Sequence, residues 1–237
     1  MLTLTWLGQG GFLLESAGCR LVVDPYLSDC LARLHNVKRL FPPPISLEDL
    51  RPDVVFVTHD HLDHFDPETL VPLFAAFPQC QLVGPESAID HGRREGFAAE
   101  RLHQVAPGQT LELGAYRCTA TVAQHSDRFA VGVLIEAGGK LLYISGDTLY
   151  SPALPPAVLS LASRTLDAAL ICINGKLNNM NAADAARVIA ALRPRVAIPM
   201  HYGLFAENTV QPDEFLALCQ AFGQATMTLE PGISVPL

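Results

Sequence analysis

The sequence is short of positive charge. It has 16 lysine and arginine residues against 24 aspartate and glutamate residues, which gives a formal net charge of −8 at pH 7. No run of basic residues is longer than a pair such as Lys38-Arg39. Proteins bind nucleic acids through basic surface that neutralises phosphates. We therefore expect no nucleic acid among the partners of this protein.

The sequence also lacks any apolar run near the length of about 20 residues that crosses a bilayer, so we expect no membrane partner. Its first residues, MLTLTWLGQGGF, lack the basic start, apolar stretch and cleavage site of a signal peptide. The six cysteines contain no CxxC pair. Scattered cysteines are typical of free thiols in a reducing compartment, and we expect a cytoplasmic protein.

Apolar residues are abundant: they fill 49% of the 237 positions, which is enough for a substantial core. Short apolar runs alternate with turn residues, and β-rich runs predict strands at 2–8, 12–16, 20–25, 53–59, 81–84, 116–124, 129–137, 140–147, 167–173, 195–200 and 225–230. Helical spacing and capping residues predict helices at 67–77, 86–95, 182–193 and 212–222, with another inside 151–163. Helices that cover two packed sheets would satisfy this order of elements.

One stretch, VFVTHDHLDHFD at 55–66, holds three of the eight histidines and three aspartates. It contains the spacing His59-x-His61-x-Asp63-His64 directly after a predicted buried strand. Such polar groups are costly beside a core unless something pairs with them. Imidazole and carboxylate groups are the usual ligands of zinc, iron and manganese. The stretch therefore predicts a metal site, with a solvated polar turn as the alternative.

A metal site needs further ligands, and three other predicted strands end in suitable residues. His125 follows TATVAQ, Asp147 follows LLYISG, and His201 follows VAIPM. Each of them alone would be an ordinary capped turn. Loops at the carboxyl ends of strands are where α/β proteins hold functional groups, so all of these residues are candidates for one site.

The segments THDHLDH, AQHS, SGDT and PMHYG together resemble the metallo-β-lactamase superfamily. The resemblance runs over almost the full length, from TWLGQGGF to the final predicted strand. It implies an α/β fold, a four-layer αββα sandwich that forms a single domain over residues 1–237, with a two-metal site at one edge. It also implies a small-molecule substrate.

Carried over position by position, the resemblance assigns His59, His61 and His125 to the first metal, and Asp63, His64 and His201 to the second, with Asp147 as the bridge. Two such metals lower the pKa of a bound water, so the bridging hydroxide would be the nucleophile. Asp63 would orient that hydroxide or move its proton. A set of histidines and carboxylates accepts zinc or manganese, and the sequence does not choose between them.

Three other segments, NVKRLFPPP, SGDTLYS and IPMHYGLFAENTVQPDEF, resemble the L-ascorbate-6-phosphate lactonase group. This resemblance implies a metal-dependent hydrolase that opens a small lactone or ester, with or without a phosphate group. The chain is shorter than those lactonases at its N-terminus. The alternatives are a phosphodiesterase of the same fold, a mononuclear iron dioxygenase, and a metal-binding protein without catalysis.

Some residues are candidates for contact with the substrate. Lys38 and Arg39 could bind a phosphate group, or they could be ordinary surface charge. Tyr202 could donate a hydrogen bond to an oxyanion, or pack. Asn208 lies in a loop where asparagine is also a normal turn residue. The sequence leaves open whether the chain forms a homo-oligomer.

Two further expectations concern groups around the ligands. Asp24 and Thr58 could orient the imidazoles that bind metal. The glycines of GQGGF, 8–12, do not follow a phosphate-binding pattern and predict a tight hairpin turn.

Overall fold

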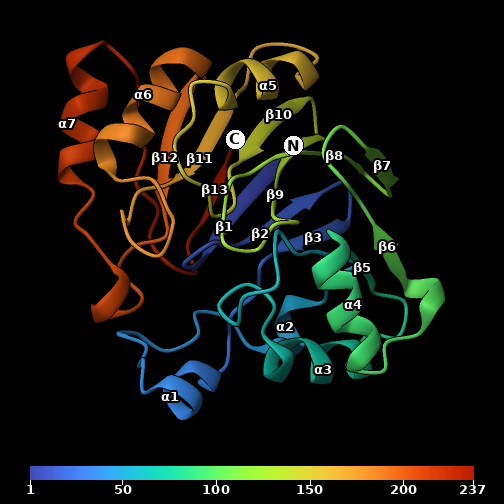
Figure 1. Cartoon of the computed structure of the whole chain (residues 1–237). Coiled ribbons are helices and arrows are strands. Elements are labelled where there is room, and N and C mark those ends of the chain that lie inside the picture. The colour runs from blue at the N-terminus through green and yellow to red at the C-terminus, as the bar shows by residue number, and fades with distance from the viewer.

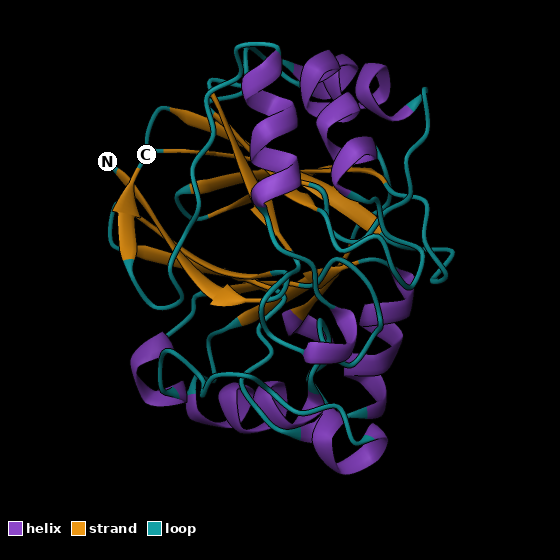
Figure 2. Cartoon of the chain, turned by 90° about the vertical axis from the view of Figure 1, so that its left-hand side faces the viewer, coloured by secondary structure: helices purple, strands orange, loops and turns teal.

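Two β-sheets lie face to face between two layers of helices in the computed structural model, which describes residues 1–237. Figure 2 shows this order of layers from the side, with strands in the middle and helices above and below them. The predicted four-layer αββα sandwich is confirmed. No helix of the structure combines the length and the apolar character that a membrane span requires.

The first sheet has the strand order β13-β1-β2-β3-β4-β5-β6. Its strands are β1 (Leu2–Gly8), β2 (Gly11–Ser16), β3 (Cys19–Val23), β4 (Val54–Phe56), β5 (Gln81–Gly84), β6 (Leu102–Gln104) and β13 (Ser234–Pro236). Strands β3 to β6 are parallel, while β13, β1, β2 and β3 pair antiparallel. The pairing of β1 with β13 places the two chain ends side by side (Figure 1).

The second sheet has the order β12-β11-β10-β9-β8-β7. Its strands are β7 (Thr110–Leu113), β8 (Tyr116–Val122), β9 (Val131–Ala137), β10 (Lys140–Ile144), β11 (Ala168–Cys172) and β12 (Val196–Met200). Strands β7 to β10 form an antiparallel meander, and β10, β11 and β12 run parallel. In each sheet the parallel strands direct their carboxyl ends toward one edge.

The helices divide between the two outer faces (Figure 1). Helices α2 (Leu47–Leu50), α3 (Pro67–Ala76) and α4 (Glu86–Arg94) lie on the first sheet, and α5 (Leu154–Leu161), α6 (Ala182–Leu192) and α7 (Asp213–Ala221) lie on the second. The short helix α1 (Cys30–His35) stands apart, and two 3₁₀ turns occupy Ala99–Arg101 and Ala206–Asn208.

The alternation of side chains along each strand explains how the first sheet packs against two hydrophobic cores. In β4, Val54 and Phe56 pack into the large core between the sheets, while Val55 packs into the smaller core under α3 and α4. In β3, Leu21 and Val23 face the first core and Val22 the second. Successive side chains of a strand point to opposite faces. A sheet covered on both faces therefore produces the continuous apolar runs seen in the sequence.

The end of the chain differs from the prediction. Residues 225–230 form only an isolated bridge, between Thr226 and Ala197, and the closing strand is Ser234–Pro236 on the other sheet. Gly232, with φ of +79°, turns the chain between these two segments. The predicted strand 53–59 is also shorter, because the Thr58 backbone N–H donates to the Asp24 side chain rather than to a neighbouring strand. Helix α1 was not predicted.

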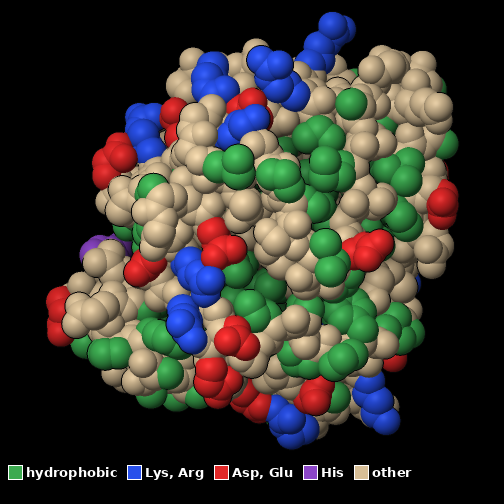
Figure 3. All heavy atoms as spheres, turned by 180° about the vertical axis from the view of Figure 1, so that it is seen from behind, with side chains coloured by type: hydrophobic (Ala, Val, Ile, Leu, Met, Phe, Trp, Pro, Cys, Tyr) green, Lys and Arg blue, Asp and Glu red, His purple; other side chains and the backbone are tan.

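The face seen in Figure 3 carries acidic and basic side chains interspersed among apolar ones. Histidine side chains are visible on this face only at one edge. The group of histidines described next therefore does not open on this side of the molecule.

Candidate metal centre

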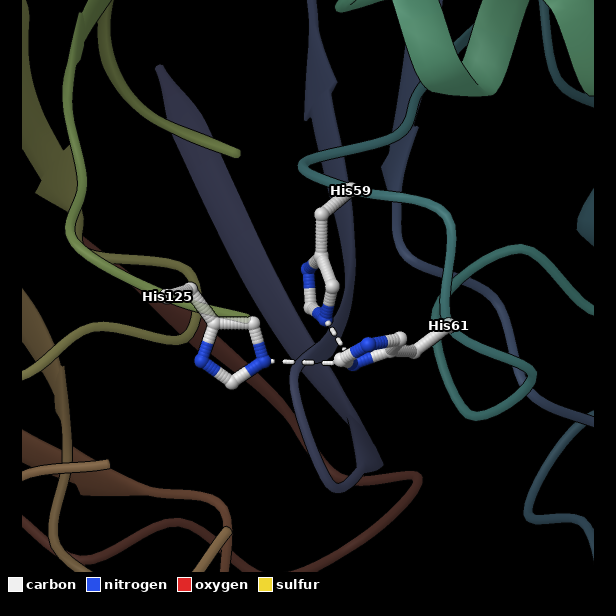
Figure 4. Close-up of side chains that lie close together, drawn as sticks. All are labelled: His59, His61 and His125. Carbon is white, nitrogen blue, oxygen red and sulfur yellow. Dashed lines mark hydrogen bonds between the residues drawn. The ribbon is translucent and has the colours of Figure 1, made fainter. Parts of the chain in front are cut away.

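Three imidazole rings converge at the edge where the strands end (Figure 4). His59 Nε2 lies 3.0 Å from His61 Nδ1, and His125 Nε2 lies 3.1 Å from the same atom. Nδ1 of His125 lies 3.1 Å from the backbone oxygen of Asn178, a contact in which only the ring can donate. That tautomer leaves a lone pair on His125 Nε2. This lone pair points at His61 Nδ1, and a proton on that nitrogen or a cation among the three rings would satisfy it.

A second group lies beside the first. Asp63 Oδ2 is 3.7 Å from His64 Nε2 and 3.5 Å from His201 Nε2. His64 and His201 are buried, whereas the Asp63 side chain keeps 16% of its surface exposed. Asp63 is therefore the member of this group that a substrate could reach.

Asp147 lies between the two groups. Its Oδ1 is 3.5 Å from His64 Nε2, and its Oδ2 is 3.1 Å from His201 Nε2 and 3.9 Å from His125 Nε2. Asn179 donates to Oδ2 at 2.8 Å, while Oδ1 is buried without a hydrogen-bond partner. A carboxylate in this position can contact a cation in either group.

Unpartnered atoms test whether these residues fit a metal. His64 Nε2 and Asp147 Oδ1 are both buried without a hydrogen bond, an arrangement that normally costs stability. The separations within the two groups run from 3.0 to 3.7 Å, close to those between ligands of one ion, which are about 3.0 to 3.5 Å for bonds of about 2.1 Å. The residues fit bound cations, and the structure brings all seven predicted ligands together: His59, His61, Asp63, His64, His125, Asp147 and His201.

Asp24 and Thr58 support the ligands from behind, as the sequence suggested. His64 Nδ1 lies 2.7 Å from Asp24 Oδ2, which also accepts from the Thr58 hydroxyl at 2.6 Å. Thr58 Oγ1 in turn lies 3.0 Å from His59 Nδ1. These contacts hold the outer nitrogen of each ring and direct Nε2 toward the centre.

A further network fixes the loop that carries the ligands. Asp60 pairs with His91, which is stacked on Phe65 at a centroid distance of 4.0 Å. The backbone N–H of Asp60 donates to Asp127 Oδ2 at 2.9 Å. No motif in the sequence pairs His91 with Asp60, because the two residues are 31 positions apart.

The protonation of the centre follows from burial and neighbouring charge. Burial lowers the pKa of His59 and His125, so both rings are neutral at pH 7. Burial also disfavours charge on His64 and His201, but the carboxylates, Asp147 foremost, outweigh it. They raise the pKa of His64 well above its ordinary value and that of His201 to about 9. Without metal, two protons thus occupy the place of cations.

We expect the metal-free protein to lose stability as the pH rises from 6.5 to 8. The unfolded histidines lose their protons near pH 6.5, whereas His64 and His201 in the folded state keep theirs until the pH approaches 9 or higher. The free energy of unfolding should fall by about 1.4 kcal/mol per pH unit for each ring. Urea unfolding at fixed salt measures this free energy. The pH range from 6.5 to 8 stays below the ordinary pKa of cysteine, about 8.5.

The metal-loaded protein is the control for this experiment. Cations compete with the same protons, so its stability should not fall over this window. A flat or rising curve for the metal-free protein would contradict the assignment of protons to His64 and His201.

The predicted substrate contacts have different surroundings. Arg39 donates to the backbone oxygens of Tyr26, Ser28 and Phe41 and is half-buried, so much of its guanidinium already holds a loop. Lys38 is exposed. A phosphate-binding role for this pair stays a prediction, and the task of Arg39 within the loop was not foreseen.

Tyr202 and Asn208 both lie near the centre. Tyr202 packs against Trp6 with ring centroids 5.1 Å apart. Burial raises the pKa of Tyr202, so its hydroxyl stays protonated at neutral pH. Asn208 is buried and its Oδ1 accepts from Asn174 Nδ2 at 2.7 Å. Their predicted roles toward substrate are neither confirmed nor excluded by these contacts.

A cavity of about 550 Å³ lies directly beside Asp63. Besides Asp63, its walls comprise the apolar side chains of Leu31, Val37, Leu177 and Phe205 and the polar side chains of His35, Lys176, Glu207 and Asn208. Leu177 is 71% exposed and has φ of +52°, an unfavourable backbone state for leucine. Strained residues of this kind cluster at functional sites.

Sequence reasoning missed two groups of this region. Lys176 brings a cation to the cavity wall and donates to the backbone oxygen of Glu207 at 3.0 Å. Gln9 is fully buried and its Nε2 donates to Asp63 Oδ2 at 3.0 Å. Gln9 lies in the GQGG turn, and its place between two glycines was the only signal in the sequence.

Comparisons with known proteins agree with this geometry. A family model described as a beta-lactamase superfamily domain matches residues 19–202. A UPF0173 protein of Pyrococcus furiosus is 30% identical over 213 residues, covering 90% of this chain and 88% of its own. A UPF0173 metal-dependent hydrolase of Methanosarcina mazei is 29% identical over 259 residues, covering 100% of this chain and 99% of its own.

Solved structures share the fold at lower identity. Igni18, a metallo hydrolase of Ignicoccus hospitalis, has a TM-score of 0.80 and 23% identity, covering 99% of this chain and 97% of that one. CmlA, a diiron β-hydroxylase of Streptomyces venezuelae, has a TM-score of 0.78 and 18% identity, covering 100% of this chain and 54% of that one. The fold thus carries both hydrolytic and oxidative enzymes, and the residues of the site must decide between them.

Proposed function

The chain belongs to the beta-lactamase superfamily, and we propose that it is a metal-dependent hydrolase that opens a small lactone or ester at a centre of two divalent cations, zinc or manganese. The observation that carries the proposal is the position of Asp147, whose oxygens lie within 4 Å of ring nitrogens from both histidine groups. A relative that covers the whole chain is named a metal-dependent hydrolase.

In this proposal each of the two groups holds one cation. The first cation would be held by His59, His61 and His125, the second by Asp63, His64 and His201, and Asp147 would serve both. When bound, the cations would supply a water of lowered pKa and a Lewis acid for the carbonyl oxygen of the substrate.

Two residues have further tasks in this proposal. The polar contacts of Asp63 are all made by Oδ2, which leaves Oδ1 free to accept a proton from the attacking water. Tyr202 keeps its phenolic proton at neutral pH and would donate a hydrogen bond to the developing oxyanion.

The cavity beside Asp63 supports a substrate with an apolar part. Leu31, Val37 and Phe205 would exclude water from it, and Lys176 offers a cation at its wall. Lys176 lines this cavity and Arg39 does not, so Lys176 is the better-placed partner for a phosphate or carboxylate on the substrate.

The first experiment measures the metal content of the purified protein and its activity on paired substrates. We expect close to two zinc or manganese ions per chain by mass spectrometry, and hydrolysis within a panel of lactones and esters offered with and without a phosphate group. Lys176→Met should raise KM roughly tenfold for the phosphorylated member of a pair and leave the other unchanged, because one charged hydrogen bond is lost.

Other outcomes would redirect the assignment. One iron per chain, with consumption of oxygen and a thiol, would replace hydrolysis by oxygen chemistry. Activity on phosphodiesters alone would favour the phosphodiesterase of the same fold. Bound metal with no turnover on either panel would point to a protein that binds metal without catalysis.

A further inference from the structure

Gln9 lies in a turn whose backbone is held by several contacts. It connects β1 to β2 with φ of +52°, a state that costs energy for a residue other than glycine. Its backbone oxygen accepts from Trp6 Nε1 at 3.1 Å and from the His201 backbone N–H at 3.0 Å. The side chain therefore starts from a fixed backbone position next to one of the proposed metal ligands.

The carboxamide of Gln9 ends between two proposed ligands of the second cation. Nε2 donates to Asp63 Oδ2 at 3.0 Å and lies 3.4 Å from His201 Nε2. The other end, Oε1, is buried without any hydrogen-bond partner. A buried amide with an unsatisfied oxygen is a cost to folding that a methionine of similar length would avoid. Packing alone therefore does not explain a glutamine here.

The next residue shows how closely this turn lies against the site. A Cβ atom at Gly10 would lie 2.8 Å from Cε1 and 3.2 Å from Nδ1 of His64. Glycine is therefore required for the turn to press against the His64 ring. His64, His201 and Asp63 all contact the segment 9–10, whereas no contact joins Gln9 to the three rings of the first group.

We infer that Gln9 is a positioning residue of the second cation site. Its N–H fixes Asp63 Oδ2 beside His201 and so turns Oδ1 of the same carboxylate away, toward the cavity. This inference rests on the proposed two-cation function. Hydrogen-bond partners of metal ligands typically set metal affinity by a factor of 10 to 100.

Two variants test the inference. Gln9→Asn keeps an amide, and asparagine tolerates a positive φ well, but its side chain is one carbon too short to reach Asp63. Gln9→Met keeps the length and loses the hydrogen bond. Gln220→Met, at an exposed position of α7, is the matched control. The readouts are the dissociation constants of both cations by chelator competition, and the thermal midpoint of the metal-free protein.

We expect the dissociation constant of the second cation to rise about 10- to 100-fold in both Gln9 variants, with that of the first cation and the metal-free midpoint little changed. A purely structural role predicts the reverse, a lower metal-free midpoint with unchanged affinity. The inference fails if the second cation binds both variants within twofold of the wild type. A wild type that binds only one cation would instead overturn the two-cation function, and the role of Gln9 with it.

Discussion

Replacing His201 by alanine is expected to reduce kcat/KM for hydrolysis by at least about a thousandfold and to leave a protein that binds one cation. The His201 ring supplies one of three ligand atoms of the second group, and Asp147 Oδ2 lies only 3.1 Å from it. Removing it leaves Asp63, His64 and the shared Asp147, so the second cation would be one ligand short of its set. Electrostatic stabilisation of the transition state typically supplies several kcal/mol, so its loss should dominate the rate.

The measurement combines metal content with steady-state kinetics on the best substrate of the panel. His103→Ala is the control, because His103 lies on β6 and no hydrogen bond or ion pair joins it to the centre. Chemistry that uses only the first cation would leave turnover in the His201 variant close to that of the wild type. That result would remove the second group from the mechanism while keeping it as a metal site.

The ligand set could be predicted from sequence because its members follow strands. His59 to His64 are close in the chain, and His125, Asp147 and His201 each come directly after a strong apolar run. Parallel strands bring their carboxyl ends to one edge, so sequence position translates directly into proximity. Asp24 follows the same rule, since it comes directly after β3.

Gln9 and Lys176 escaped prediction because neither follows a motif of its own. Gln9 meets Asp63 across 54 positions and His201 across 192, and only the paired sheets make these contacts. Lys176 comes four residues after β11 and faces the cavity because of the positive φ of Leu177 and Asn178. Backbone turns at residues with positive φ depend on the tertiary contacts around them.

Arg39 shows why the role of a charged residue is hard to predict from sequence. A basic pair suggests an anion site, but a guanidinium can equally satisfy backbone oxygens of a folded loop. Three oxygens from a 16-residue span of chain, at Tyr26, Ser28 and Phe41, accept from it. Charge in a sequence does not reveal which way the group will point.

The prediction of a strand at 225–230 failed for a related reason. Residues 225–230 alternate in a way that favours a strand, yet only Thr226 forms a bridge, and the backbone instead donates and accepts around Ala197. The true closing strand is only three residues long, and its partner β1 lies at the other end of the chain. Register of this kind is set by long-range pairing rather than by local pattern.

Asp24→Asn is expected to weaken binding of the second cation by at least about tenfold to a hundredfold, and to lower the free energy of unfolding of the metal-free protein by roughly 3 to 5 kcal/mol. Asp24 is fully buried, and its two oxygens accept from the Thr58 backbone N–H at 2.7 Å, from the Thr58 hydroxyl at 2.6 Å and from His64 Nδ1 at 2.7 Å. An asparagine must turn its NH₂ group toward one of these donors, whichever way the amide points.

The exchange acts through the lost acceptor rather than through backbone strain. Asp24 has φ of +43°, which asparagine adopts at least as easily, so the substitution adds no strain of its own. If the new amide faces His64 Nδ1, the ring must take the other tautomer, and its Nε2 then carries the proton where a cation should bind. Chelator competition and urea unfolding measure the two effects, with the exposed Asp90→Asn as control. Unchanged metal affinity together with unchanged stability would mean that the buried Asp24–His64 pair does not orient the ring, and the second group would need another source of its geometry.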